Sequence, residues 1–295
     1  MRTDADPSGC SGTTNTTNSR PLVDHSASHI DGRIELASHR AFLGTCVLLF
    51  AAGVTLTIYW RNSMSGGMTM PGGWTMSMTW MRMQGQSWFD AAMAFLGMWV
   101  VMMAAMMLPA LVPVLLRYRV SLSGLQSNHL AALTTLAGAA YVFVWALLGA
   151  AVYPIGAVLA KTVMASDVLA RLVPIAAGMV VLLAGYLQVT KWKMRQLCRC
   201  RAASTAGKVL PRDARAAWGH GIRLGRDCAL CCLALIAVML VTGVMNLATM
   251  AFVTVAIAAE RLMPHPEWTA RTTGVVIIAA AVFMIGGSLS AYLTE

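Results

Sequence analysis

The sequence contains few charged residues and none of the short motifs that mark common enzymes. Asp, Glu, Lys and Arg make up 12% of the chain, whereas soluble globular proteins have about 25%. The chain also lacks the GxSxG, HExxH, phosphate-loop and dinucleotide-binding motifs, so no residue is predicted to be catalytic and hydrolysis or nucleotide-driven pumping has no support. A P-type pump is excluded because no separate soluble domain is present.

Hydrophobic residues make up 58% of the chain, and the mean hydropathy is +0.65. These values indicate an integral membrane protein with one membrane domain, residues 41–295. Runs of about 20 apolar residues are long enough to cross a bilayer as helices. The predicted fold is therefore an all-α, polytopic transmembrane helix bundle, with clear spans at 41–60, 89–116, 130–159, 172–189 and 273–293.

One apolar stretch, 228–262, is too long for a single straight span. A helix of that length would extend about 50 Å, whereas the hydrocarbon layer is about 30 Å thick. Gly243 suits a helix end and Asn246 suits the cap of a following helix. We therefore predict two short helices here and seven spans in total, or six if one tilted helix crosses.

The distribution of basic residues predicts the orientation. Ten of the 22 Lys and Arg residues lie in the segment 191–227, which is predicted to be a cytoplasmic loop because positive loops stay inside. Residues 1–40 lack the apolar run of a signal peptide and are predicted to be a disordered cytoplasmic tail. The expected location is the bacterial inner membrane. The net charge of +10 then reflects topology and contact with anionic membrane lipid, so nucleic-acid binding is not needed to explain it.

Methionine is concentrated in one part of the chain: 13 of the 22 methionines lie between Met64 and Met107. Thioether sulfur is a soft, uncharged ligand that suits Cu(I). The predicted outer loop, 61–88, is rich in glycine and contributes the candidate metal ligands Met64, Met68, Met70, Met76, Met78, Met81 and Met83. The alternative is a lid that lies in the membrane interface and dips Met and Trp into lipid.

The second predicted span continues the methionine pattern. At 100° per residue, Met98, Met102 and Met106 lie within an arc of about 80° around the helix axis and so share one face. They are candidate ligands. The opposite face carries small residues, which allow close helix packing. The methionines could therefore face lipid or a partner subunit instead. Pro109 and Pro113 are expected to kink or end this helix.

The cysteines form a second group of candidate ligands. Two clusters fall on the predicted cytoplasmic side, where structural disulfides are not expected, and they comprise Cys198, Cys200, Cys228, Cys231 and Cys232. On a helix, the last three share roughly one face. The alternative is that they are small packing residues. Met245, in the turn near Gly243, is expected on the side of the outer methionines.

Ionisable residues near the spans carry less information. Asp90, Asp227, Glu260 and Arg261 lie at predicted span ends. We expect them to be interfacial, and either solvated or ion-paired.

Four motifs together resemble a bacterial family of integral membrane proteins that are predicted to bind metal and whose function is unknown. The motifs are PGGWTMSMTWMRM at 71–83, MWVVMMAAMMLP at 98–109, the Cys228 to Cys232 cluster, and GVMNL at 243–247 with Glu260. The resemblance covers most of the chain from the first span onward. It implies a multi-span inner-membrane protein, with copper the metal most often suggested. The chain departs from the family pattern at 196–200, which reads QLCRC where a CLxxC run is expected.

The leading hypothesis is a membrane protein that handles Cu(I). Outer methionines would capture the ion, the second span would pass or hold it, and inner cysteines would exchange it with a partner such as a copper-carrying protein. Eukaryotic high-affinity copper transporters combine similar parts, which is an analogy only. One alternative is an assembly factor or accessory subunit of a membrane oxidase. A copper-dependent oxidoreductase is disfavoured, because redox copper sites usually use imidazole and the spans lack a His-rich set.

Overall fold

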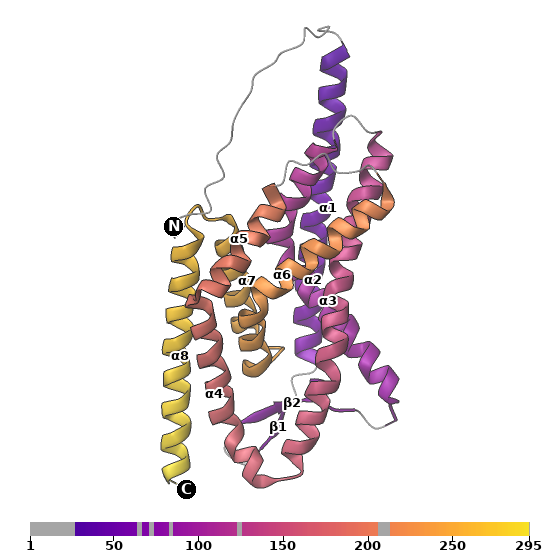
Figure 1. The fold of residues 1–295 in the computed structure, drawn as a ribbon. Coiled ribbons are helices and arrows are strands. Elements are labelled where there is room, and N and C mark those ends of the chain that lie inside the picture. Colours follow the sequence, from indigo (N-terminus) through magenta and orange to yellow (C-terminus); the bar gives the residue numbers. More distant parts are fainter. Residues whose placement is uncertain are drawn as a thin grey trace, which may run out of the picture. The chain divides into compact units, whose positions relative to one another are not determined.

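The computed structural model describes residues 27–63, 67–70, 74–82, 85–122, 126–205 and 213–294. Two compact units divide the chain, Met1–Phe42 and Leu43–Glu295, and all packing described below lies within the second. The elements are, in order, α1 (Ala27–Ser63), β1 (Gly67–Thr69), β2 (Thr75–Ser77), the 3-10 turn η1 (Met78–Trp80), α2 (Trp88–Ser121), α3 (Ser127–Met164), α4 (Asp167–Val189), α5 (Lys191–Thr205), α6 (Ala214–Thr242), α7 (Leu247–Leu262) and α8 (Pro266–Thr294) (Figure 1). The predicted all-α class is confirmed, with one short β-hairpin added.

Within the described residues, six helices combine the length and the apolar composition needed to cross a membrane. These segments are Arg40–Ser63, Trp88–Ser121, Asn128–Met164, Asp167–Val189, Ala214–Thr242 and Pro266–Ser290. Helix α7, at 16 residues, is too short to be counted with them. The segment predicted as a basic loop, 191–227, is largely helical, because it contains α5 and the start of α6.

The predicted break in the long apolar stretch is confirmed at the expected residues. Helix α6 ends at Thr242, and its C-cap is Gly243, whose φ of +111° is a conformation that residues with a side chain rarely adopt. Helix α7 then begins after Asn246, whose side chain accepts hydrogen bonds from the backbone N–H groups of Ala248 and Thr249. Glycine and the asparagine cap therefore reverse the chain between two apolar helices.

Helix α2 is longer than its prolines suggest. It continues through Pro109 and Pro113 to Ser121, so the two prolines do not end it. A capping box fixes its first turn: the Ser87 hydroxyl accepts the Asp90 N–H, and the Asp90 carboxylate accepts the Ser87 N–H. Asp90 thus has a local structural role.

Small residues let the helices approach closely at two interfaces. Gly221 of α6 lies against the backbone of Ala137 in α3, where a Cβ atom would clash. Gly185 of α4 meets Ile278 of α8 in the same way, and Figure 1 shows α4 and α8 side by side. Such contacts are typical of helix packing in membranes.

The β-hairpin packs onto the ends of α2, α3 and α4. Its strands pair Met68 with Met76. The Trp80 ring fills the space above Gly156 of α3, and the Trp74 indole N–H donates to the carbonyl oxygen of Ala170 in α4 at 2.9 Å. This part of the predicted outer loop is therefore fixed against the helices, and Figure 1 shows its strands beside α3 and α4.

Candidate metal site

The methionines of α2 point into the bundle. Five of them are only 0–4% exposed, and we call them the methionine face: Met98, Met102, Met103, Met106 and Met107. Met93, one to two turns earlier, is 51% exposed. The packed side of α2 is therefore its sulfur side, which contacts α3 and α7.

The small residues of α2 lie largely on the other side. Ala94 and Gly97 are exposed, and Ala105 lies against Gly53 of α1. This arrangement contradicts the alternative in which the small face is packed inside and the sulfur atoms face lipid. The sulfur atoms are instead surrounded by protein, so together they can bind an ion that enters the bundle.

Aromatic rings cover the end of the methionine face that is nearest to the hairpin. Phe95 lies 5.3 Å from Trp80, 5.8 Å from Trp99 and 5.1 Å from Tyr153, measured between ring centroids. The Trp99 indole N–H donates to the carbonyl oxygen of Trp145 at 3.0 Å. Rings from η1, α2 and α3 therefore pack together at this end of the methionine face.

At its other end, the methionine face meets the cysteines of α6. The Sδ atom of Met107 lies 3.9 Å from the Sγ atom of Cys228, and the Tyr141 hydroxyl of α3 lies 3.0 Å from the same Sγ atom. All three side chains are buried. A thioether and a thiol are thus in contact at the meeting point of α2, α3 and α6.

From Cys228 onward, four buried thiols follow one another. The side chains of these thiols interact with one another in series: Cys228 with Cys232, Cys232 with Cys231, and Cys231 with Cys200 of α5. We call this series the thiol chain. The hydrogen bond to Cys231 lowers the pKa of the Cys200 thiol, which makes the metal-binding thiolate form more accessible.

The thiols follow one another in a series and do not converge on one point. Within the part of the chain that the structure describes, no three His, Cys, Asp or Glu side chains are grouped as ligands of a single ion. A tetrahedral zinc site, which needs four such ligands, is therefore not formed there. Pairs of sulfur atoms are sufficient for Cu(I), a soft ion that accepts two-coordinate geometry.

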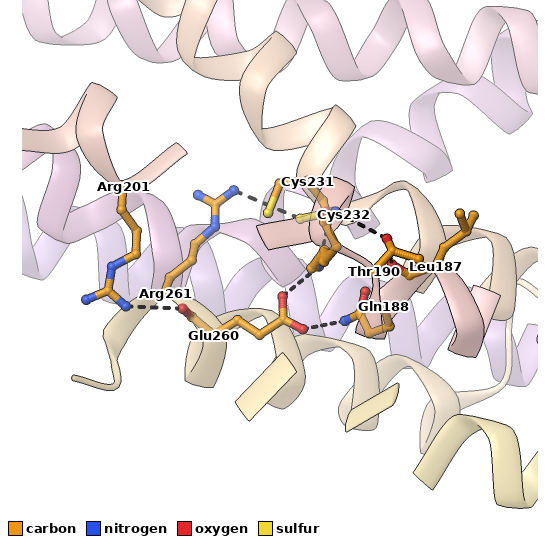
Figure 2. A network of polar contacts seen from close by, with 9 residues as sticks. Leu187, Gln188, Thr190, Arg201, Cys231, Cys232, Glu260 and Arg261 are labelled. Atoms are coloured by element: carbon orange, nitrogen blue, oxygen red, sulfur yellow. Dashed lines mark hydrogen bonds and ion pairs between the residues drawn. The ribbon is translucent and has the colours of Figure 1, made fainter. Parts of the chain in front are cut away.

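A buried ion pair lies beside the thiol chain. The Lys193 ammonium of α5 is 2.8 Å from a Glu260 carboxylate oxygen of α7, and the two side chains are 1% and 2% exposed. Lys193 also donates to the carbonyl oxygen of Cys231 at 2.8 Å, and the Gln188 amide of α4 donates to Glu260. Figure 2 shows this network, which connects α4, α5, α6 and α7.

The charges in this network support one another. Burial acts to lower the pKa of the Lys193 ammonium, but Cys231 and Glu260 outweigh this effect and hold the pKa above its usual value. Lys193 is therefore a cation in the folded protein. We expected Glu260 to be interfacial and either solvated or ion-paired; it is ion-paired and is buried between α5 and α7.

Two arginines lie around the same network. The Arg261 guanidinium is directed toward Cys232, with 3.9 Å between Nη2 and Sγ (Figure 2). Arg201 of α5 donates to the backbone carbonyl oxygens of Glu260 and Met263, at 3.4 and 2.7 Å, and so closes the last turn of α7. Both therefore connect α7 to the helices that carry the thiols.

The remaining predicted ligands are more dispersed. Met76 is buried, Met70 and Met81 are half-buried, and Met245 is half-buried in the turn between α6 and α7. Met64 and Met83, and the side chains of Met68 and Met78, lie outside the described residues. Cys198 is half-buried on α5 and is not part of the thiol chain.

Several residues of the site did not stand out in the sequence. Met107 fell at the edge of the predicted methionine face, and Tyr141 lies in an ordinary apolar span. Lys193 is one of ten basic residues in its segment and cannot be distinguished there from solvated neighbours. The one available signal was Glu260, a carboxylate at the end of an apolar helix, which requires a partner if it is buried.

The fold and the site define a class: a helical bundle with helices long enough to span a membrane and with buried thioether and thiol groups in contact. The chain belongs to the PpoB2 copper chaperone family, whose model matches residues 96–284. This membership associates the chain with copper. No curated protein and no solved structure matched the chain. The matched range contains the methionine face and the thiol chain, and it begins after the Met64 to Met83 segment.

Proposed function

We propose that this protein is a membrane-bound Cu(I) chaperone of the bacterial inner membrane. In this proposal the hairpin methionines capture the ion, the methionine face holds it in transit, and the thiol chain exchanges it with a partner. The contact between Met107 and Cys228, at 3.9 Å between sulfur atoms, carries the proposal. It links the two kinds of sulfur ligand within one protein interior.

The chemistry of the ligands predicts that the thiols bind Cu(I) more tightly than the methionines do. Thioether ligands are neutral, so a Cu(I) ion on the methionine face keeps its full positive charge in an apolar environment, which is costly. Thiolates cancel that charge. The methionine face therefore suits passage, and the thiol chain suits retention.

Topology supports the membrane location. Six helices are long and apolar enough to span a bilayer, and the segment 191–227 holds ten Lys and Arg residues. With positive residues inside, the thiol chain lies near the cytoplasmic surface, the N-terminus is cytoplasmic, and the hairpin lies outside. The sulfur ligands then form a series across the membrane.

The test is anaerobic titration of the purified full chain with Cu(I) against a chromophoric Cu(I) chelator. Replacing Met98, Met102, Met106 and Met107 by Leu should reduce the number of bound ions, because leucine keeps the volume and removes the sulfur. A second variant replaces Met76, Met78, Met81 and Met83 by Leu and tests the hairpin. The matched control is Met93→Leu, on the exposed side of the same helix.

Unchanged binding in the first variant would exclude the methionine face as a ligand set. Unchanged binding in the second would exclude capture by the hairpin. Loss of binding in the Met93→Leu control to the same extent would indicate general damage and contradict the assignment.

A second candidate function is insertion of copper into a membrane oxidase, as an assembly factor or accessory subunit. The match to a copper chaperone family supports this candidate as well, because a chaperone delivers its ion to another protein. Proteoliposomes that contain the purified protein and enclose a Cu(I) chelator distinguish transport across the membrane from delivery to an oxidase. Vectorial copper movement supports transport, whereas co-purification with an oxidase and no such movement supports delivery.

A further inference from the structure

The thiol chain contains one cysteine pair that joins two different helices. Cys200 of α5 and Cys231 of α6 are both buried, and their side chains interact with each other. The two helices are in contact at this point, because Lys193 of α5 donates to the carbonyl oxygen of Cys231 at 2.8 Å. Cys231 and Cys232, by contrast, are consecutive on one helix and about 100° apart around its axis, so their sulfur atoms cannot lie on opposite sides of one ion. Cys228 is already in contact with Tyr141 and Met107. The interhelical pair is the one best placed to hold an ion between two opposed sulfur atoms.

Binding at this pair creates a negative charge. One Cu(I) ion replaces the two thiol protons, which are released, and the product is a Cu(I) bis-thiolate with a net charge of −1. An unbalanced anion in a buried site is strongly unfavourable. A built site of this kind therefore requires one excess positive charge nearby.

The surrounding charges supply that excess. Lys193 is neutralised by Glu260 in the buried ion pair. Arg201 is half-buried and donates to backbone carbonyl oxygens at the end of α7. Arg261 has its Nη2 atom 3.9 Å from the Sγ atom of Cys232, the thiol that contacts Cys231.

Arg261 also has unused hydrogen-bonding capacity. Its Nε atom is buried and has no hydrogen-bond partner among the described residues. A guanidinium stays charged under all physiological conditions, so it is a permanent counter-charge that is present before the metal arrives. An unpartnered N–H group on this cation is what a site prepared for an anion would show.

We propose that Cys200 and Cys231 hold one Cu(I) ion as a two-coordinate bis-thiolate and that Arg261 supplies its counter-charge. Arg261 is a positioning residue, because it acts through charge and does not bind the ion. The inference rests on the proposed function and adds to it the ligands of the retaining site.

Selenium labelling tests the ligands without any mutation. The full chain is produced with selenomethionine, loaded anaerobically with half an equivalent of Cu(I), and measured by X-ray absorption at the copper edge. We expect a shell of two sulfur atoms and no selenium, because only cysteines bind. A copper–selenium shell, or three or more sulfur atoms, overturns the inference while leaving methionine-based handling of Cu(I) intact. Absence of bound Cu(I) overturns the proposed function itself.

Variants test the individual residues by competition with a Cu(I) chelator. Cys200→Ser and Cys231→Ser should each abolish the tightest binding, whereas Cys46→Ser, which removes a buried thiol of α1, should leave it unchanged. Arg261→Met should weaken binding about tenfold or more, and Arg261→Lys should restore most of the loss because it restores the charge. Wild-type affinity in Cys200→Ser, in Cys231→Ser or in Arg261→Met contradicts the assignment.

Discussion

The methionine face and the thiol chain are both buried rows of sulfur atoms, but their surroundings differ. The methionine face lies on one helix and is covered by apolar and aromatic side chains such as Phe95 and Trp99. The thiol chain lies between α5 and α6 and is bordered by Lys193, Glu260 and Arg261. One region is uncharged, whereas the other contains a buried ion pair and a further cation.

This difference indicates how one protein can both release and retain the same ion. An uncharged environment stabilises neither the ion nor any anion, so a site made of thioethers holds Cu(I) weakly and lets it move. A region with fixed charges stabilises thiolates and retains Cu(I) until a partner offers stronger ligands. The Met107–Cys228 contact is where the two environments meet.

The largest expected difference between the two regions is in the free energy of unfolding, and it concerns the buried ion pair beside the thiol chain. Lys193→Met leaves the Glu260 carboxylate buried without its partner, and we expect a loss of about 3–5 kcal/mol in the free energy of unfolding. Glu260→Gln leaves Lys193 unpaired in the same way. Met102→Leu, on the methionine face, should cost less than about 1.5 kcal/mol. Unfolding of each purified variant in a denaturing detergent measures these differences.

The double variant Lys193→Met with Glu260→Gln is the control for this prediction. Because it removes both charges together, it should lose much less than the sum of the two single losses. Additive losses would show that the two residues do not act as a pair.

The next largest expected effect is a difference in affinity between metal ions. Since no three His, Cys, Asp or Glu side chains of the described residues are grouped around one point, the protein should bind Cu(I) or Ag(I) at least about a hundredfold more tightly than Zn(II), which needs four ligands in a structural site. Competition titrations of the same preparation with each ion measure the ratio. Tight Zn(II) binding that depends on Cys231 would contradict this arrangement.

Much of the fold could be predicted from the sequence because it depends on local and periodic features. Apolar runs marked the long helices, and Gly243 and Asn246 marked the break, since a positive φ and an N-cap are properties of single residues. The ends of α2 were less predictable. Its continuation past Pro109 and Pro113 depends on surrounding helices, which the sequence does not display.

For the candidate site, the sequence predicted which types of residue could be ligands, but not which of them are in contact. Helical periodicity grouped Met98, Met102 and Met106 on one face, but the same periodicity left open whether that face was inside or outside. The pairing of Lys193 with Glu260 joins residues that lie 67 positions apart, and no local pattern encodes it. The QLCRC run at 196–200, which departs from the family pattern, gave no sign that Cys200 contacts Cys231.

The central claim is that the buried methionine face of α2 accepts Cu(I). Its most direct test is NMR of the full chain with ¹³C-labelled methionine methyl groups, titrated with Cu(I) under anaerobic conditions. The account predicts shifts of the Met102, Met106 and Met107 methyl resonances, with Met93, on the exposed side of α2, unchanged. Shifts confined to exposed methionines, with the buried resonances unmoved at saturation, would contradict it.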